Sequence, residues 1–117
     1  MDPFDGGTPR PELRFERARL RGGVTCLAVA GEVDMTTGEL FQETLTHALY
    51  EPGVTRVLLD TAPLRFIDSN GVAVLIKARR SAEEQGIAFG IVNAHGVVRS
   101  VLEMLGVYDV LAAESGR

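Results

Sequence analysis

Three short apolar runs, each leading into a segment with helical periodicity, constrain the fold more than any other feature. The runs are Val24 to Ala30, Thr55 to Asp60 and Ile87 to Val92. Runs of this length indicate buried strands, and strand–helix–strand units join parallel strands through right-handed crossovers. The nearly continuous apolar run of seven residues from Val24 to Ala30 has the pattern of a strand that is covered on both faces.

A further strand before the first run completes the predicted sheet. Residues 13–20 begin with apolar and charged side chains in alternation, and Arg21-Gly22-Gly23 forms a tight turn into the next strand. These two strands therefore make an antiparallel hairpin. The predicted fold is α/β: a mixed sheet of four to five strands with an antiparallel first hairpin and parallel inner strands, packed by helices.

Three helical patterns alternate with the strands. Thr36 and Glu39 match a capping box at the start of the first helix. The second pattern begins at Val72 and ends before Gly86, which is placed as a left-handed C-terminal cap. The third begins at His95 and carries an apolar stripe.

The chain length and the composition of its ends define the domain boundaries. Apolar residues make up 45% of the 117 residues, which is sufficient for a single core. Residues 1–11 contain three prolines and two glycines, so we expect a flexible N-terminal tail. The domain is expected to occupy residues 12–113, and residues 114–117 form a C-terminal tail.

Charge and hydropathy exclude several classes of partner. The net charge is −4, with 12 basic and 16 acidic residues, which argues against binding to nucleic acid. No apolar stretch approaches the roughly 20 residues of a membrane helix, and the N-terminus lacks the pattern of a secretory signal. Cys26 is the only cysteine, so no disulfide forms within the chain. We expect a cytoplasmic protein without a membrane partner.

The sequence contains no recognisable catalytic motif. There is no Gly-x-Ser-x-Gly elbow, and neither His47 nor His95 is placed by a motif as a general base. No pair of histidines, cysteines or carboxylates has metal-ligand spacing, and no phosphate-binding glycine loop is present. We therefore expect a non-enzymatic protein with no metal and no cofactor.

The most informative polar cluster is Asp68-Ser69-Asn70-Gly71, between two apolar runs. This loop and the loop ending at Asp34 both follow parallel strands, so Asp34, Asp68 and Ser69 are expected to lie close together. Ser69 stands where a helix N-cap belongs. It is also a reachable phosphoacceptor, whose phosphate the start of a helix would tolerate while the presented charge changed sharply.

Two motifs resemble those of the STAS domain, in the branch of anti-sigma factor antagonists. They are GEVDMTTGEL, Gly31 to Leu40, and LLDTAPLRFIDSNGVAVL, Leu58 to Leu75. The resemblance implies that Ser69 is phosphorylated by an anti-sigma factor that is itself a serine kinase with a histidine-kinase-like ATPase fold. It also implies a partner-binding surface around this serine, comprising Asp34, Thr36, Asp68, Asn70, Gly71, Val72 and Val74.

The resemblance further implies a partner switch in bacterial transcription, of the kind used in stress responses and sporulation. The unphosphorylated protein would bind the kinase and so free a sigma factor, and a phosphate on Ser69 would end that binding. A PP2C-type phosphatase would restore the active form. Asn70 stands where the family often has a second hydroxyl, which makes Ser69 the only acceptor in the motif. The alternative is a scaffold or transport-associated STAS module in which Ser69 is not phosphorylated.

Overall fold

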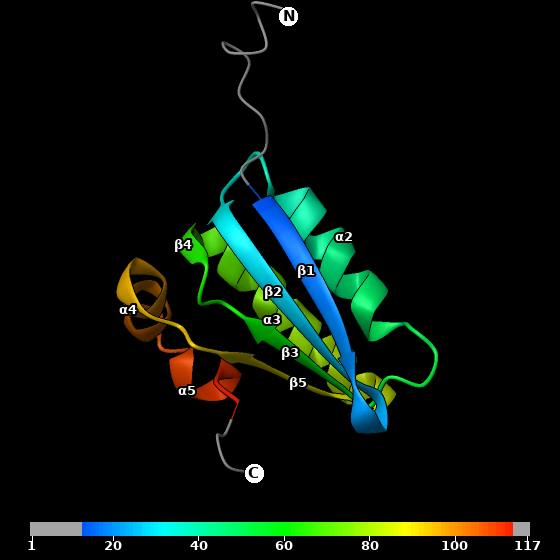
Figure 1. The fold of residues 1–117 in the computed structure, drawn as a ribbon. Helices are drawn as coiled ribbons and strands as arrows, with labels where there is room; N and C mark the ends of the chain where they lie inside the picture. Colours follow the sequence, from blue (N-terminus) through cyan, green and yellow to red (C-terminus); the bar gives the residue numbers. More distant parts are fainter. Residues whose placement is uncertain (1–12, 114–117) are drawn as a thin grey trace, which may run out of the picture.

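A mixed five-stranded sheet forms the centre of the molecule (Figure 1). The computed structural model describes residues 13–113. The strands are β1 (Leu13–Leu20), β2 (Val24–Val33), β3 (Arg56–Asp60), β4 (Leu64–Ile67) and β5 (Ala88–Val92). The helices are a short 3-10 helix (Arg21–Gly23), α2 (Gly38–Leu49), α3 (Ser69–Gln85), α4 (Gly96–Met104) and α5 (Tyr108–Leu111). The expected boundaries at residues 1–11 and 114–117 lie outside the described residues.

The sheet confirms the predicted topology. β1 pairs with β2 in antiparallel fashion, and the strand order is β1-β2-β3-β5. β3 and β5 run parallel to β2 and to one another in the ladder. β4 pairs in parallel with the end of β2, beyond the point where β3 stops. The long strand β2 therefore pairs with β1, β3 and β4, and its carboxyl end lies beside that of β4.

The sequence analysis does not predict β4 (Leu64–Ile67). It has four residues, and only its first and last are buried. Such a strand carries no alternating pattern long enough to detect. Its pairing with β2 is nevertheless what brings the start of α3 next to the end of β2.

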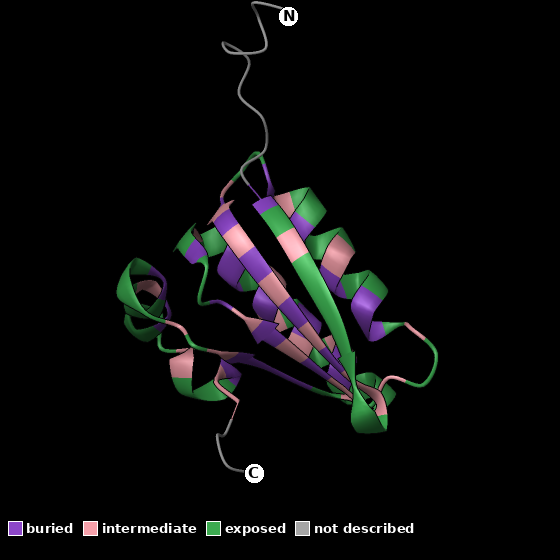
Figure 2. Cartoon of the chain, viewed as in Figure 1, coloured by how far each residue is buried: buried purple, intermediate pink, exposed green. Residues whose placement is uncertain are grey.

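The helices α2 and α3 lie against one face of the sheet, and α4 and α5 lie beyond its β4 and β5 side (Figure 1). Alternate residues of β2 point into the core formed with these helices, and the others are only partly buried (Figure 2). The expectation that β2 is covered on both faces was therefore wrong for residues 13–113. The seven-residue apolar run misled because small side chains such as Ala28 and Ala30 occupy the outward positions.

The helix ends agree only in part with the sequence. Gly86 ends α3 in the left-handed conformation, with φ of 74°, as predicted. The start of α3 lies three residues before the predicted Val72, at Ser69. The predicted capping box of α2 is absent, because Thr37 occupies the N-cap position and makes no side-chain capping bond.

Candidate functional site

Backbone pairing places two acidic residues side by side at the carboxyl end of the sheet. Val33 of β2 pairs with Ile67 of β4, and the amide of Asp68 donates to the carbonyl of Val33 at 3.0 Å. Asp34 and Asp68 directly follow the two paired residues. The predicted proximity of Asp34, Asp68 and Ser69 is thus a consequence of strand register.

Asp68, rather than Ser69, caps α3. The Asp68 carboxylate accepts a hydrogen bond from the Gly71 amide at 2.8 Å, and its backbone is extended, as an N-cap requires. Ser69 is the first residue of the helix and is exposed. Within residues 13–113, its hydroxyl has no hydrogen-bond partner. The prediction that Ser69 occupies the N-cap was wrong by one position, since either residue type suits a cap.

Gly71 fixes the first turn of α3 against the sheet. A Cβ at this position would lie 2.6 Å from side-chain carbons of both Ile67 and Val33, closer than carbon atoms approach. Only glycine therefore allows the helix to pack this closely on β2 and β4. The next residue, Val72, is 4% exposed and belongs to the core. Gly71 and Val72 therefore support the surface around Ser69 rather than form it.

The loop from β2 to α2 folds around the carboxylate of Asp34. Asp34 Oδ1 accepts from the Thr36 amide at 2.9 Å and from the Thr36 hydroxyl at 2.7 Å. Hydrogen bonds from Thr36, and secondarily from Thr37, hold the pKa of Asp34 below its usual range. The buried Thr37 hydroxyl donates to the Glu32 carbonyl at 2.9 Å and accepts from the Asp34 amide at 3.0 Å. The threonines thus shape this loop rather than cap α2.

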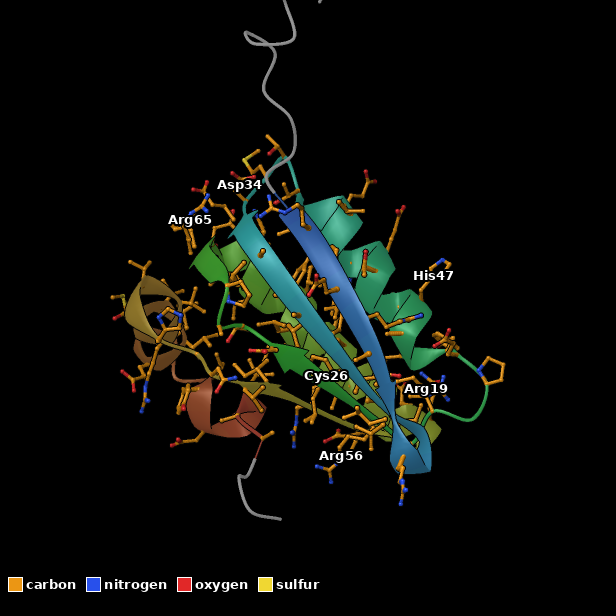
Figure 3. All side chains as sticks on the ribbon, viewed as in Figure 1. Arg19, Cys26, Asp34, His47, Arg56 and Arg65 are labelled. Atoms are coloured by element: carbon orange, nitrogen blue, oxygen red, sulfur yellow. The ribbon has the colours of Figure 1, made fainter. Side chains whose placement is uncertain are left out.

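The remaining predicted residues lie at or near the surface. Asn70 is exposed, and Val74 is partly buried on the same helix, next to the exposed Ala73, which was not among the predicted residues. Figure 3 shows Asp34 and Arg65 of β4 at the same end of the sheet, and Arg65 forms an ion pair with Glu32 of β2 at 3.5 Å. The site is therefore a polar surface beside partly exposed small apolar residues.

Two apolar side chains near this surface were not predicted. Met35, directly after Asp34, is 82% exposed, and Phe66 in β4 is 37% exposed. No polar or titratable group marks either residue, so its residue type suggested no role. Large exposed apolar side chains beside a polar rim are a common feature of protein-binding surfaces. Their position in the two motif segments was the available signal.

The described residues offer no nucleophile with an adjacent base. His47 lies on the outer side of α2, away from Asp34 (Figure 3). The ring of His95 lies 2.8 Å from the carbonyl of Ala62. Neither histidine hydrogen-bonds Ser69, and residues 13–113 contain no cluster of three metal-binding side chains. No helix in the same part of the chain is long and apolar enough to cross a bilayer.

Comparisons with known proteins agree with this fold. The model of the STAS domain matches residues 17–115. The chain is 22% identical over 99 residues to an anti-sigma F factor antagonist of Paenibacillus polymyxa, covering 85% of this chain and 84% of the relative. It is 26% identical over 84 residues to the anti-sigma-F factor antagonist RsfB of Mycobacterium tuberculosis, covering 72% and 67% of the two chains.

Among solved structures, the fold is similar to that of the unphosphorylated anti-sigma factor antagonist SpoIIAA. The TM-score is 0.72 at 21% identity, and the match covers 87% of this chain and 90% of the other. The family model spans both motif segments. The chain belongs to the STAS domain family.

Proposed function

We propose that this protein is an anti-sigma factor antagonist whose activity is switched by phosphorylation of Ser69. The unphosphorylated protein binds an anti-sigma factor that is a serine kinase and so frees a sigma factor. The kinase transfers the γ-phosphoryl group of ATP to the Ser69 oxygen, which loses its proton, and ADP leaves. A PP2C-type phosphatase then hydrolyses the phosphate ester.

The observation that carries this proposal is the free hydroxyl of an exposed Ser69 on a fixed helix start. Asp68 takes the capping role, so phosphorylation would break no hydrogen bond among residues 13–113. Gly71 holds the first turn against β2 and β4. The acceptor oxygen is therefore accessible to a kinase and held in position at the same time, which favours transfer.

Local charge explains how a phosphate would act as a switch. A phosphoserine carries a charge of about −1.5 to −2 at neutral pH. The amino end of α3 tolerates this charge, whereas Asp68 and the neighbouring Asp34 oppose it. In a complex, the same charge would be removed from water next to these carboxylates, which is costly. Binding of the partner would therefore weaken far more than the fold.

The experiment tests phosphorylation and binding together. The purified protein is incubated with a candidate anti-sigma kinase from the same genome, ATP and Mg²⁺, and phosphopeptides are identified by mass spectrometry. We expect phosphate on Ser69 and none in Ser69→Ala. Ser100→Ala is the matched control, because Ser100 is also exposed but lies on α4, and it should be phosphorylated normally.

Binding to the same kinase separates the switch from a constitutive module. We expect Ser69→Ala to bind as tightly as the unmodified protein, and the phosphorylated protein to bind at least about tenfold more weakly, or about 1.4 kcal/mol. Tight binding by a fully phosphorylated sample would refute the switch. Binding without phosphorylation by an active kinase would support a scaffold or transport-associated module instead.

A further inference from the structure

The outward face of β1, β2 and β3 has an apolar centre, although Arg14 and Glu16 of β1 place two charges on its outer edge. The outward residues of β2 are Val24, Cys26, Ala28, Ala30 and Glu32, all of them partly buried. Strand register places Ala18 on one side of Cys26 and Leu58 on the other. A sheet face in contact with water normally carries polar side chains. No helix crosses the outward face of β1 and β2 in Figure 1.

The rest of the chain offers little apolar surface to cover this face. Ala113 contacts the face only at its β5 edge, where a Cβ on Gly90 would lie 2.9 Å from the Ala113 Cβ. The sequence of residues 114–117 is Glu-Ser-Gly-Arg, which contains no large apolar side chain. Residues 1–12 contain only two large apolar side chains, Met1 and Phe4. The area over β1, β2 and β3 therefore suits another chain.

Two opposite charges on β3 indicate what kind of chain can bind to this face. Arg56 and Asp60 lie on the outward side, paired with Val24 and Ala28 of β2, and Leu58 lies between them. Arg56 forms no ion pair with any described residue. One oxygen of Asp60 accepts from the Ala62 amide and from the Asn93 side chain, each at 3.0 Å, which leaves the other oxygen available.

We propose that this face binds a second copy of the chain about a two-fold axis that crosses the strands at the level of Cys26 and Leu58. This axis reverses the order of residues along β3. Arg56 of each copy therefore lies opposite Asp60 of the other, and two intermolecular ion pairs form. Cys26, Leu58 and Ala18 meet their own counterparts in the apolar centre of the contact.

The size of the face sets the strength of the contact. With strands about 4.8 Å apart and outward residues about 6.7 Å apart along each strand, the face measures roughly 400 Å² per copy. Twice this area is below the roughly 1,200 Å² of a stable specific interface. The dimer is therefore weak and forms at high protein concentration. The reversed strands place the two Ser69 surfaces at opposite ends, so this proposal is independent of the phosphorylation switch.

Charge reversal tests the arrangement directly. Sedimentation velocity over a series of concentrations should show reversible dimers of the full chain. Arg56→Asp and Asp60→Arg should each lower the association constant at least about tenfold, because like charges then face each other. An equimolar mixture of the two variants should restore association, since every facing pair is again of opposite sign. Arg80→Asp, on the exposed side of α3, is the charge-matched control.

Two further measurements keep the test decisive if Asp60→Arg disturbs its loop. Leu58→Glu places like charges across the axis and should abolish association, while circular dichroism checks that the variant is folded. The rate of N-ethylmaleimide labelling at Cys26 should fall as the concentration of the unmodified protein rises. A monomer at every concentration, or a dimer unaffected by both Arg56→Asp and Leu58→Glu, would overturn the proposal.

Discussion

The helices α2 and α3 begin with similar residues but are built differently. Each follows a strand that ends at the same edge of the sheet, and each start contains an aspartate, a hydroxyl residue and a glycine. At α3, Asp68 bonds the amide of Gly71, and Gly71 packs against two strands. At α2, Asp34 bonds its own loop through Thr36, and no side chain caps the helix.

The comparison shows that packing, more than residue type, decides which side chains a helix start exposes and how firmly it holds them. The start of α3 is held by a side-chain cap and by core contacts, so Ser69 has a fixed position. The start of α2 is held by a local turn, which leaves Met35 82% exposed. One segment is suited to a chemical modification that requires a defined position, and the other is suited to an adaptable apolar contact.

The largest expected effect comes from replacing Gly71 at the start of α3. Gly71→Ala should lower the free energy of unfolding by about 1–3 kcal/mol, because the new Cβ overlaps core side chains of Val33 and Ile67. Gly38→Ala is the matched control, since a Cβ there has no neighbour within 4 Å. It should be neutral or stabilise by up to about 1 kcal/mol. Urea denaturation measures both, and equal effects would contradict the difference between the helix starts.

A smaller effect is expected from the caps. Asp68→Ala should cost about 1 kcal/mol because the Gly71 amide loses its acceptor, whereas Asp68→Asn should retain most of the stability. Glu39→Ala should change stability by less than about 0.5 kcal/mol, since the predicted capping box of α2 does not form. Thermal denaturation of the three variants compares them. A loss at Glu39 as large as that at Asp68 would show that α2 is capped in solution.

The smallest effect concerns the titration of Asp34. Its lowered pKa means that its contribution to stability is present above the pKa of the unfolded chain and is lost as the pH falls through the folded pKa. Thr36→Val removes the hydroxyl donor and should raise the pKa of Asp34 toward its ordinary value. Carboxyl NMR shifts measured against pH test this.

Thr44→Val is the control for that titration, because the Thr44 hydroxyl bonds the Leu40 carbonyl within α2 and leaves Asp34 untouched. A pKa of Asp34 that stays low in Thr36→Val would show that backbone amides alone hold it down. The stability difference between Thr36→Val and the unmodified protein should shrink in acid, where Asp34 is protonated in both.

Much of the fold could be predicted because its signals are local. The apolar runs of β2, β3 and β5, the turn at Arg21-Gly22-Gly23 and the left-handed cap at Gly86 depend on nearby residues alone. β4 could not be predicted, because its four residues form a strand only by pairing with β2. The open face of β2 was missed for a similar reason, since apolar small residues look the same whether they are covered or not.

In the site, too, some features follow from the local sequence and others depend on tertiary packing. Asp34, Asp68 and Ser69 were predicted to meet because the strand ends gather them. The identity of the cap was not predictable, since Asp and Ser are nearly equivalent at that position and only the helix start distinguishes them. The close contact of Gly71 with Val33 and Ile67 depends on the distance between α3 and the sheet. No sequence pattern contains that distance.

The bond between Asp68 and the Gly71 amide also affects how long a phosphate would persist. A phosphoryl group at the start of a helix usually draws on the free amides there. The Gly71 amide is already engaged, which leaves only the amides of Ser69 and Asn70 in the first turn. A phosphate on Ser69 would therefore find fewer amide donors than at a helix start whose amides are all free, and the helix would hold it less firmly. The lifetime of such a signal would be set by the enzymes around the protein rather than by the protein itself.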